Sequence, residues 1–307
     1  MEAADEQYLL ERNIPLGLVQ ECQAIAPSLP SARRLFVHSR TGKRFRSIHS
    51  LAEFLSSPLQ RWLVSIASLP DLELKRQAQL YHELGYVICR QALSPTAIDE
   101  LLNGHAAVGE ESPNPGKRPR LCRAKSHQWL GAKQCIKMHR QESGLGVLAE
   151  RGRGRYDLPL PHFLLRQVLA HLGSLWPLIQ ALLPKGSVKT ANVMLSAPGS
   201  SRQDKHTDSS GNKTGPPHYL TVLIPLTEQD KHTGMTQLWP KSHHAPLAKE
   251  EGSPICPTLA VGDALVFDGL LHHLGTENAT KDRDRYFFYL AYSTKRTDPN
   301  MQLTREW

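Results

Sequence analysis

Five short β-rich segments, separated by turn residues, dominate the second half of the chain. Several of them are apolar at successive positions, which is typical of strands covered on both faces, inside a sandwich or a closed barrel. This pattern predicts that the chain folds around an antiparallel β-sandwich. The segments are residues 192–196, 219–224, 236–239, 264–267 and 285–292.

Helices are predicted to precede this sandwich. Residues 72–84 have the apolar spacing of a helix that stops at Gly85, and residues 86–90 then form a short strand. Ser94 provides a helix cap, with Pro95 at the first helical position. We therefore expect an α+β fold in which helices flank the β-structure. Two further helices are predicted, at residues 163–172 and 175–183.

Composition restricts the class of protein. With 307 residues and 40% hydrophobic residues, the chain has room for one large domain, or for one of about 200–250 residues with an appendage. No apolar run approaches the ~20 residues that span a bilayer, and the acidic, polar first residues do not resemble a signal peptide. Five scattered cysteines favour neither a disulfide framework nor a zinc site. We expect an intracellular protein, cytoplasmic or nuclear, without a membrane partner.

The formal net charge of +8 favours anionic partners such as nucleic acid, phosphorylated substrates or anionic cofactors, without selecting one of them. Two zones are strongly basic, residues 40–46 and residues 114–155. The second zone also contains His127 and Trp129, an arrangement suited to phosphate neutralisation with base stacking. A solvated loop explains the same residues. Lys117-Arg118-Pro119-Arg120 is a weak nuclear-import-like run.

Three residues form a candidate metal site. His206 and Asp208 are two positions apart, so on an extended segment their side chains point to the same side. His273, which follows a predicted strand, is the candidate for a third ligand. Two histidines and one carboxylate leave coordination positions open, as in non-haem Fe(II) oxygenases. An HxD triplet also arises by chance, and a single histidine is more often an ordinary surface or core residue.

Arg285 begins the last predicted strand. A guanidinium buried in a β-barrel requires an anionic partner, because an unpaired buried charge is very costly. A dicarboxylate co-substrate would supply that partner through a bidentate pair. A structural salt bridge to Asp263 or Asp268 is the alternative.

Several motifs, in order, resemble the phytanoyl-CoA dioxygenase-like family of Fe(II)/2-oxoglutarate oxygenases. The match covers about residues 70–295. The resemblance implies a double-stranded β-helix (jelly-roll) core and an enzyme that uses Fe(II), 2-oxoglutarate and dioxygen. The motifs are QLYHELGYVI (79–88), LSPTAIDEL (93–101), HTD (206–208), LTVLIPLTEQDKHTGMTQLWPKSHH (220–244), GDALVFDGLLHHLGTEN (262–278) and Arg285.

The same resemblance assigns roles to individual residues. It implies that His206, Asp208 and His273 bind Fe(II), and that Arg285 binds the distal carboxylate of 2-oxoglutarate. Asn192 is a weaker candidate for contact with this co-substrate. His272 and Arg283 are the alternatives to His273 and Arg285. The family's spacing favours His273, and the apolar strand that follows Arg285 favours Arg285.

The chain departs from the family in two places. Lys241 stands where the family's PGSH motif has glycine, and the basic insert at 108–156 is not a family signature. Such enzymes usually build variable substrate loops in that stretch. Asp208 is retained, whereas relatives that halogenate replace this acid with a small residue. The resemblance therefore implies hydroxylation of C–H bonds of a substrate.

The basic N-terminal segment resembles part of a methyl-CpG-binding domain. Residues 36–47 are similar to the family's "YxxSPSGKKFRS", and Arg46 matches an arginine that reads a guanine edge in the major groove. Arg34 replaces an expected acid, and the segment that carries the family's other DNA-reading arginine is too short. A general DNA contact and a plain hairpin–helix remain alternatives.

The predicted organisation is a basic segment at 1–60, followed by a dioxygenase domain at 61–307. A hydroxylase is the first hypothesis, with a substrate that is either a small metabolite or acyl conjugate, or a nucleic-acid base. The alternatives are a DNA-directed oxygenase acting on methylated bases, a DNA- or chromatin-binding protein with an inactive oxygenase core, and a metal-binding jelly roll without 2-oxoglutarate chemistry.

Overall fold

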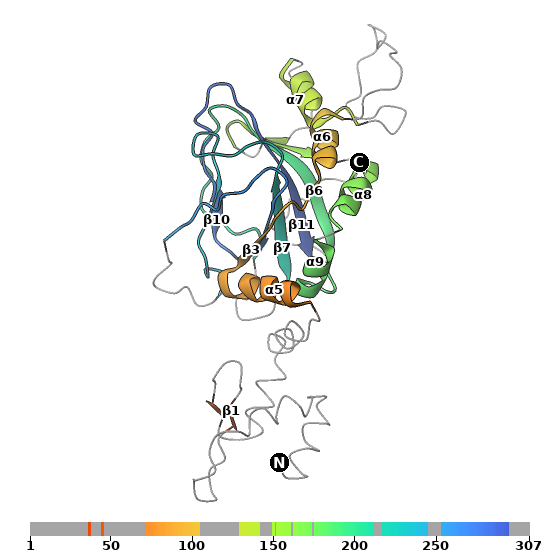
Figure 1. Cartoon of the computed structure of the whole chain (residues 1–307). Coiled ribbons are helices and arrows are strands. Elements are labelled where there is room, and N and C mark those ends of the chain that lie inside the picture. The colour runs from red at the N-terminus through yellow and green to blue at the C-terminus, as the bar shows by residue number, and fades with distance from the viewer. Residues whose placement is uncertain are drawn as a thin grey trace, which may run out of the picture. The chain divides into compact units, whose positions relative to one another are not determined.

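The chain divides into two units, Met1–Leu69 and Pro70–Trp307. The computed structural model describes residues 36–37, 44–45, 71–104, 129–141, 149–150, 152–160, 162–173, 175–210, 217–244 and 253–294 (Figure 1). In the first unit, β1 (Phe36–Val37) pairs antiparallel with β2 (Arg44–Phe45). Arg46 lies outside the described residues, so the methyl-CpG-like resemblance and the domain assignment of residues 1–60 stay predictions.

A seven-stranded antiparallel sheet forms the frame of the second unit. A smaller sheet pairs β8 (Thr236–Leu238) with β10 (His273–Gly275). The fold is α+β with a double-stranded β-helix core, as the sequence predicts. The large sheet runs in the order β3 (Tyr86–Cys89), β9 (Ala264–Asp268), β7 (Tyr219–Pro225), β11 (Arg285–Ser293), β6 (Ser187–Ser196), β5 (Arg155–Pro159), β4 (Ala149–Glu150).

Helices cover the outer face of the large sheet. In Figure 1, α8 and α9 lie on the β6 side of this sheet, and β10 lies on the opposite side. Asp71 and Ser94 cap the first two helices, since each side chain accepts a hydrogen bond from the first helical turn. Within the described residues, no helix is long and apolar enough to cross a membrane. The helices are α5 (Leu72–Leu84), α6 (Pro95–Asn103), α7 (Ala132–Gln141), α8 (His162–His171) and α9 (Trp176–Leu182).

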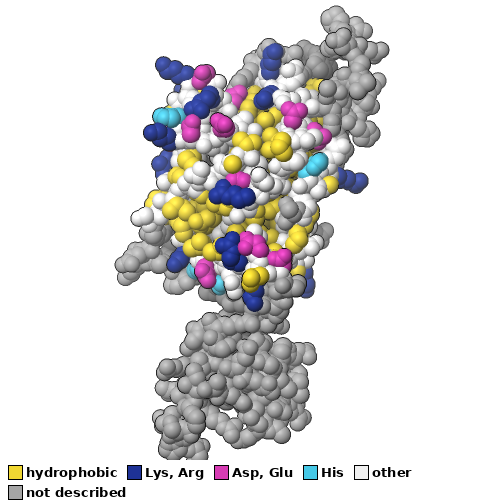
Figure 2. All heavy atoms as spheres, in the orientation of Figure 1, with side chains coloured by type: hydrophobic (Ala, Val, Ile, Leu, Met, Phe, Trp, Pro, Cys, Tyr) yellow, Lys and Arg dark blue, Asp and Glu magenta, His cyan; other side chains and the backbone are white. Residues whose placement is uncertain are grey.

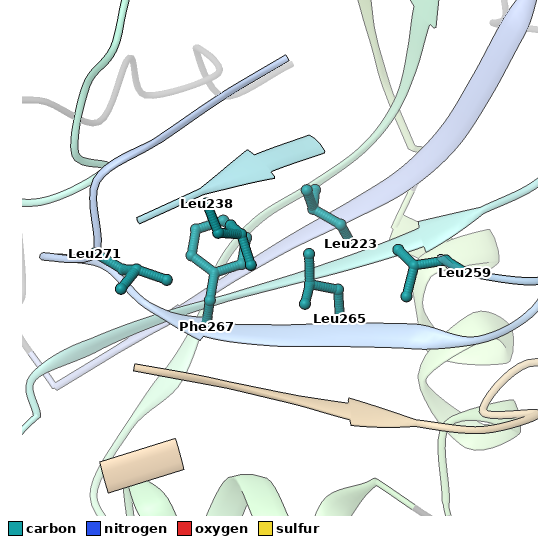
Figure 3. Close-up of a cluster of buried hydrophobic side chains, with 6 residues drawn as sticks. All are labelled: Leu223, Leu238, Leu259, Leu265, Phe267 and Leu271. Carbon is teal, nitrogen blue, oxygen red and sulfur yellow. The ribbon is translucent and has the colours of Figure 1, made fainter. Parts of the chain in front are cut away.

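A cluster of apolar side chains fills the space between the two sheets. Figure 3 shows Leu238 of β8 pointing toward Phe267 of β9. Burial of such side chains contributes roughly 1.5–3 kcal/mol each, so this cluster anchors the smaller sheet against the large one. The cluster consists of Leu223, Leu238, Leu259, Leu265, Phe267 and Leu271.

The described part of the basic zone at 108–156 differs from the expected surface loop. It contains α7, β4 and the start of β5, which joins the large sheet beside β6. Trp129 is only 1% exposed and donates its indole N–H to the Leu101 carbonyl at 3.1 Å. Arg155 is also buried. Neither side chain is therefore available to nucleic acid, which corrects the stacking role suggested for Trp129; His127 lies outside the described residues.

Candidate metal centre and cofactor pocket

A backbone bridge places two histidines next to each other. The N–H of His206 donates to the carbonyl of His273, and the N–H of His273 donates to the carbonyl of His206, both at 3.0 Å. Directly opposite residues of an antiparallel pair project their side chains to the same face. The centres of the two imidazole rings are accordingly 4.4 Å apart.

Asp208 completes a three-residue cluster. Its Oδ1 is 3.5 Å from Nε2 of His273 and 3.9 Å from Nε2 of His206. One potential ligand atom from each residue lies within 4.8 Å of the others, close enough to surround one metal ion. The structure thus brings together the three residues that the sequence singles out as metal ligands, while His272 lies outside this cluster.

The hydrogen bonds of the two histidines suit metal binding. Nδ1 of His206 lies 2.8 Å from the Asp204 carbonyl, and Nδ1 of His273 lies 3.0 Å from the Leu271 carbonyl. A carbonyl oxygen only accepts, so each Nδ1 carries the proton. In the neutral imidazole, Nε2 then presents a lone pair toward Asp208, which is the arrangement found in histidines that bind a metal.

The charge state of Asp208 is also that of a metal ligand. Burial opposes ionisation of this carboxyl, but His273, a hydrogen bond from Thr221 and His206 together lower the pKa of Asp208 to about 2. Burial lowers the pKa of His273, and Asp208 outweighs this effect, so that the pKa of His273 is raised. A metal therefore meets a charged carboxylate and competes with a proton for His273.

Thr221 on β7 holds Asp208 from the side of the large sheet. Its Oγ1 donates a hydrogen bond of 2.6 Å to Oδ2 of Asp208, which leaves Oδ1 facing the histidines. A hydrogen bond of this kind orients a carboxylate that binds a metal and strengthens metal binding. Sequence reasoning did not identify Thr221; its only sequence signal is a hydroxyl within an otherwise apolar strand.

Arg285 lines the same pocket as the three candidate ligands, together with apolar side chains such as Phe267 and Phe287. Its side chain is buried, with 2% exposure. Nη2 donates to Ser196 Oγ at 2.9 Å, but Nε and Nη1 have no hydrogen-bond partner. Burial, with a smaller contribution from Arg155, lowers the pKa of Arg285 to about 9. The pocket thus contains a buried cation with unpaired donors, for which a carboxylate is a suitable partner.

The structural salt bridge considered for Arg285 is not formed. Asp263 instead pairs with Arg90 at 2.6 Å. Asp268 accepts a hydrogen bond from the N–H of Leu270 at 2.8 Å and lies near the Tyr81 hydroxyl. In the described part of the chain, no carboxylate lies within ion-pair distance of Arg285.

The remaining candidates have other positions. Arg283 is exposed and pairs with Asp230 at 3.0 Å, outside the pocket. Asn192 is buried on β6 opposite Tyr289, a pocket residue, although Asn192 itself does not line the pocket. Its Oδ1 accepts a hydrogen bond from Thr190, and its Nδ2 has no partner. Asn192 is therefore close to the pocket wall, with one donor available.

A jelly-roll core that contains a His–Asp–His cluster and a buried arginine is the framework of an Fe(II)/2-oxoglutarate-dependent oxygenase. The chain belongs to the phytanoyl-CoA dioxygenase (PhyH) family, whose pattern matches residues 81–286. It is thus an enzyme of the Fe(II)/2-oxoglutarate-dependent dioxygenase class. No curated protein matches the chain significantly.

Several solved structures resemble the chain at low sequence identity. The non-heme alpha ketoglutarate dependent epimerase SnoN from nogalamycin biosynthesis is 16% identical, with a TM-score of 0.51 over 72% of this chain and 80% of that chain. EctD from S. alaskensis with bound Fe is 17% identical, with a TM-score of 0.48 over 71% and 75%. HygX from Streptomyces hygroscopicus, with nickel, 2-oxoglutarate and hygromycin B bound, is 10% identical, with a TM-score of 0.47 over 72% and 87%.

Proposed function

We propose that this protein hydroxylates a C–H bond of an organic substrate, with conversion of 2-oxoglutarate and dioxygen to succinate and CO₂. In this proposal His206, Asp208 and His273 bind Fe(II), and Arg285 binds the distal carboxylate of 2-oxoglutarate. The observation that carries the proposal is the buried Arg285, with two unpartnered donors, in the pocket that also contains the three candidate ligands.

The chain's own residues prepare this site. Thr221 and the backbone carbonyls behind the histidines fix the three ligand side chains before any metal arrives. Phe267 and Phe287 provide apolar walls that exclude water around the reacting groups. When bound, iron with 2-oxoglutarate supplies the oxidising chemistry that the side chains lack.

The two histidines differ in their contact with solvent. The side chain of His206 is 38% exposed, whereas that of His273 is 7% exposed. The pocket therefore opens on the His206 side and is closed on the His273 side. We infer that the substrate approaches past His206, with Arg285 at the opposite, buried end of the co-substrate.

The direct test is succinate release with Fe(II), 2-oxoglutarate and a substrate panel that includes methylated DNA. His206→Ala and Asp208→Ala should each lower turnover at least about 100-fold, because each removes one of three ligands. His272→Ala is the matched control, since this neighbouring histidine lies outside the cluster. Wild-type turnover in either ligand variant would overturn the metal assignment.

The co-substrate assignment has its own test. Arg285→Met should raise the KM for 2-oxoglutarate by about 10-fold or more, because a hydrogen-bonded charge pair is lost. Arg283→Met, which removes an exposed arginine two residues away, should leave this KM unchanged. Equal effects of the two substitutions would contradict the role given to Arg285.

A nucleic-acid substrate is the alternative proposal. Its support is the charge of residues 40–46 and 114–155, most of which lie outside the described residues. On the face shown in Figure 2, basic side chains are interspersed with acidic ones rather than gathered in a patch. If the basic zones contact phosphates, binding of duplex DNA must weaken steeply with salt. DNA binding that does not change with salt concentration would contradict the nucleic-acid proposal, and only the small-substrate proposal would remain.

A further inference from the structure

A second buried arginine, Arg155 on β5, lies behind the pocket and does not line it. Its guanidinium is held from several directions by backbone carbonyls. Nε donates to Ser201 O at 3.0 Å, and Nη2 donates to Thr276 O at 2.7 Å and to Gly275 O at 3.2 Å. These bonds fix both the position and the plane of the group.

Ser196 connects this fixed arginine with Arg285. Nη1 of Arg155 donates to Ser196 Oγ at 2.8 Å, and Nη2 of Arg285 donates to the same oxygen at 2.9 Å. A guanidinium has no acceptor, so the serine hydroxyl accepts from both groups with its two lone pairs. The three residues lie directly opposite one another on adjacent strands, with Arg155 on β5, Ser196 on β6 and Arg285 on β11.

Glycines allow both guanidinium groups to approach the backbone closely. A Cβ at Gly275 would lie 3.0 Å from Nη1 of Arg155. A Cβ at Gly234, whose φ is +90°, would lie 2.5 Å from Nη1 of Arg285. The surrounding backbone is therefore shaped around the two arginines. Within the described residues, Ser196 is the one side chain that accepts a hydrogen bond from both.

Two like charges in one buried region repel each other, and Arg155 contributes to the lowered pKa of Arg285. The carbonyl oxygens around Arg155 and the negative charge of nearby Glu277 offset part of this cost for Arg155. Nε and Nη1 of Arg285 have no partner. An anion bound beside Arg285 would compensate the buried positive charge of this residue. The second positive charge also strengthens the attraction for that anion at short range.

We propose that Arg155 and Ser196 are positioning residues for the co-substrate: Arg155, acting through Ser196, holds the guanidinium of Arg285 in the orientation that binds the distal carboxylate of 2-oxoglutarate. This inference rests on the proposed function. Arg155 itself touches no co-substrate atom. This chain of hydrogen bonds, the Arg155–Ser196–Arg285 relay, makes the enzyme discriminate between 2-oxo acids that have a distal carboxylate and those that do not.

The test compares two ligands on the same protein. Calorimetric titration of the Fe(II)-loaded full chain, without oxygen, gives the Kd for 2-oxoglutarate and for 2-oxopentanoate, in which a methyl group replaces the distal carboxylate. Ser196→Ala and Arg155→Lys should each weaken 2-oxoglutarate binding about 10-fold or more. Neither substitution should change 2-oxopentanoate binding by more than about twofold, because this ligand does not use Arg285.

The double variant tests the relay itself. If Arg155 acts through Ser196, the combined substitution should cost little more than either one alone, whereas independent effects would multiply. Ser200→Ala is the matched control, since it removes a buried serine hydroxyl that has no partner. It should leave both Kd values unchanged. Thermal unfolding of each variant separates a general loss of stability from a change in ligand preference.

The outcomes separate the two proposals. A wild-type protein that binds 2-oxoglutarate no better than 2-oxopentanoate overturns the proposed role of Arg285, and the relay with it. A wild-type protein that prefers 2-oxoglutarate, together with variants that keep this preference, overturns the relay alone. Arg155 would then be a structural link between the loops that contain Ser201 and Thr276.

Discussion

Thr221 shows how a single hydroxyl sets the geometry of the candidate metal centre. Its 2.6 Å hydrogen bond occupies Oδ2 of Asp208 and directs Oδ1 toward the histidines. The two residues meet through the fold rather than through sequence proximity, since they are 13 positions apart in the chain. Thr221 is fully buried, whereas the side chain of His206 is partly exposed, so this contact lies on the buried side of Asp208.

Thr221→Val keeps the shape of the side chain and removes the hydroxyl. We expect it to weaken Fe(II) binding about 10- to 100-fold, the usual effect of losing a residue that orients a ligand. Metal titration followed by calorimetry measures this change. Thr227→Val, at a threonine of the same region that lines no part of the pocket, serves as the control. Equal metal affinity in wild type and Thr221→Val would contradict the orienting role.

The residue types at the site were predictable, and their supporting contacts were not. The HxD spacing and the glycine-flanked His273 carry a recognisable pattern, so the sequence identifies the three candidate ligands and Arg285. Thr221, Ser196 and Arg155 become neighbours only through pairing of strands far apart in the chain. No local spacing encodes such register, so these three residues required the structure.

At the scale of elements, the loop after β8 contains a lysine in an unusual backbone conformation. Lys241 has a φ of +69°, in the left-handed region that favours glycine. Its N–H donates to the Leu84 carbonyl at 2.9 Å, so the loop is held against the end of α5. The sequence has Lys241 where the family that it resembles has glycine, and the structure shows that this lysine adopts the conformation suited to glycine.

Lys241→Gly should therefore stabilise the protein. A left-handed conformation costs an L-residue roughly 1–2 kcal/mol, and glycine avoids this cost in the folded state. The greater conformational freedom of glycine in the unfolded chain offsets roughly 0.5–1 kcal/mol of that gain. We expect the free energy of unfolding to rise by about 0.5–1 kcal/mol in denaturant titrations. Lys231→Gly, at another exposed turn lysine without positive φ, should produce no such gain.

The turn that begins β9 depends on Asp263. Its carboxylate accepts hydrogen bonds from the N–H groups of Gln91 and Ala260 and from Arg90. Burial opposes ionisation, but these partners together lower the pKa of Asp263. A depressed pKa stabilises the fold above the unfolded value of about 3.9, and this contribution is lost as the pH falls through the folded pKa.

Asp263→Asn should lower the free energy of unfolding at pH 7 by about 1–3 kcal/mol, because an amide N–H then faces donors. The difference from wild type should shrink as the pH falls below about 4, because the unfolded chain binds a proton at this carboxyl first. The difference is lost once the pH is below the lowered pKa of folded Asp263. Denaturant titrations at several pH values measure both effects. Asp282→Asn, at an exposed position, is the control. A difference that is independent of pH would show that the charge is unimportant.

Element positions were easier to predict than element limits. The helix at 72–84 and the start of the helix at Pro95 are confirmed, because caps and a terminal glycine mark them in the sequence. The strand predicted at 192–196 instead begins at Ser187, and β5 was not predicted. Arg155 and Asp157 gave that segment a polar character, although both are buried in the sheet.

At the scale of the whole molecule, the metal should affect stability without being required for folding. Mass action stabilises the folded state by about 2.7 kcal/mol at a metal concentration 100 times the Kd. We expect Fe(II), added without oxygen to chelator-treated protein, to raise the Tm of the second unit by roughly 5–10 °C. Calorimetric melting measures this shift. Asp208→Ala should melt at the same temperature with and without Fe(II).

The hydrogen bonds between His206 and His273 have a consequence for how the enzyme responds to iron supply. They join two segments of the chain through backbone atoms alone, so we expect the two candidate ligands to stay side by side when no ion connects them. This differs from small zinc domains, which unfold when the metal is withdrawn. We therefore expect removal of iron to leave the protein folded but inactive, and restored iron to reactivate it without refolding.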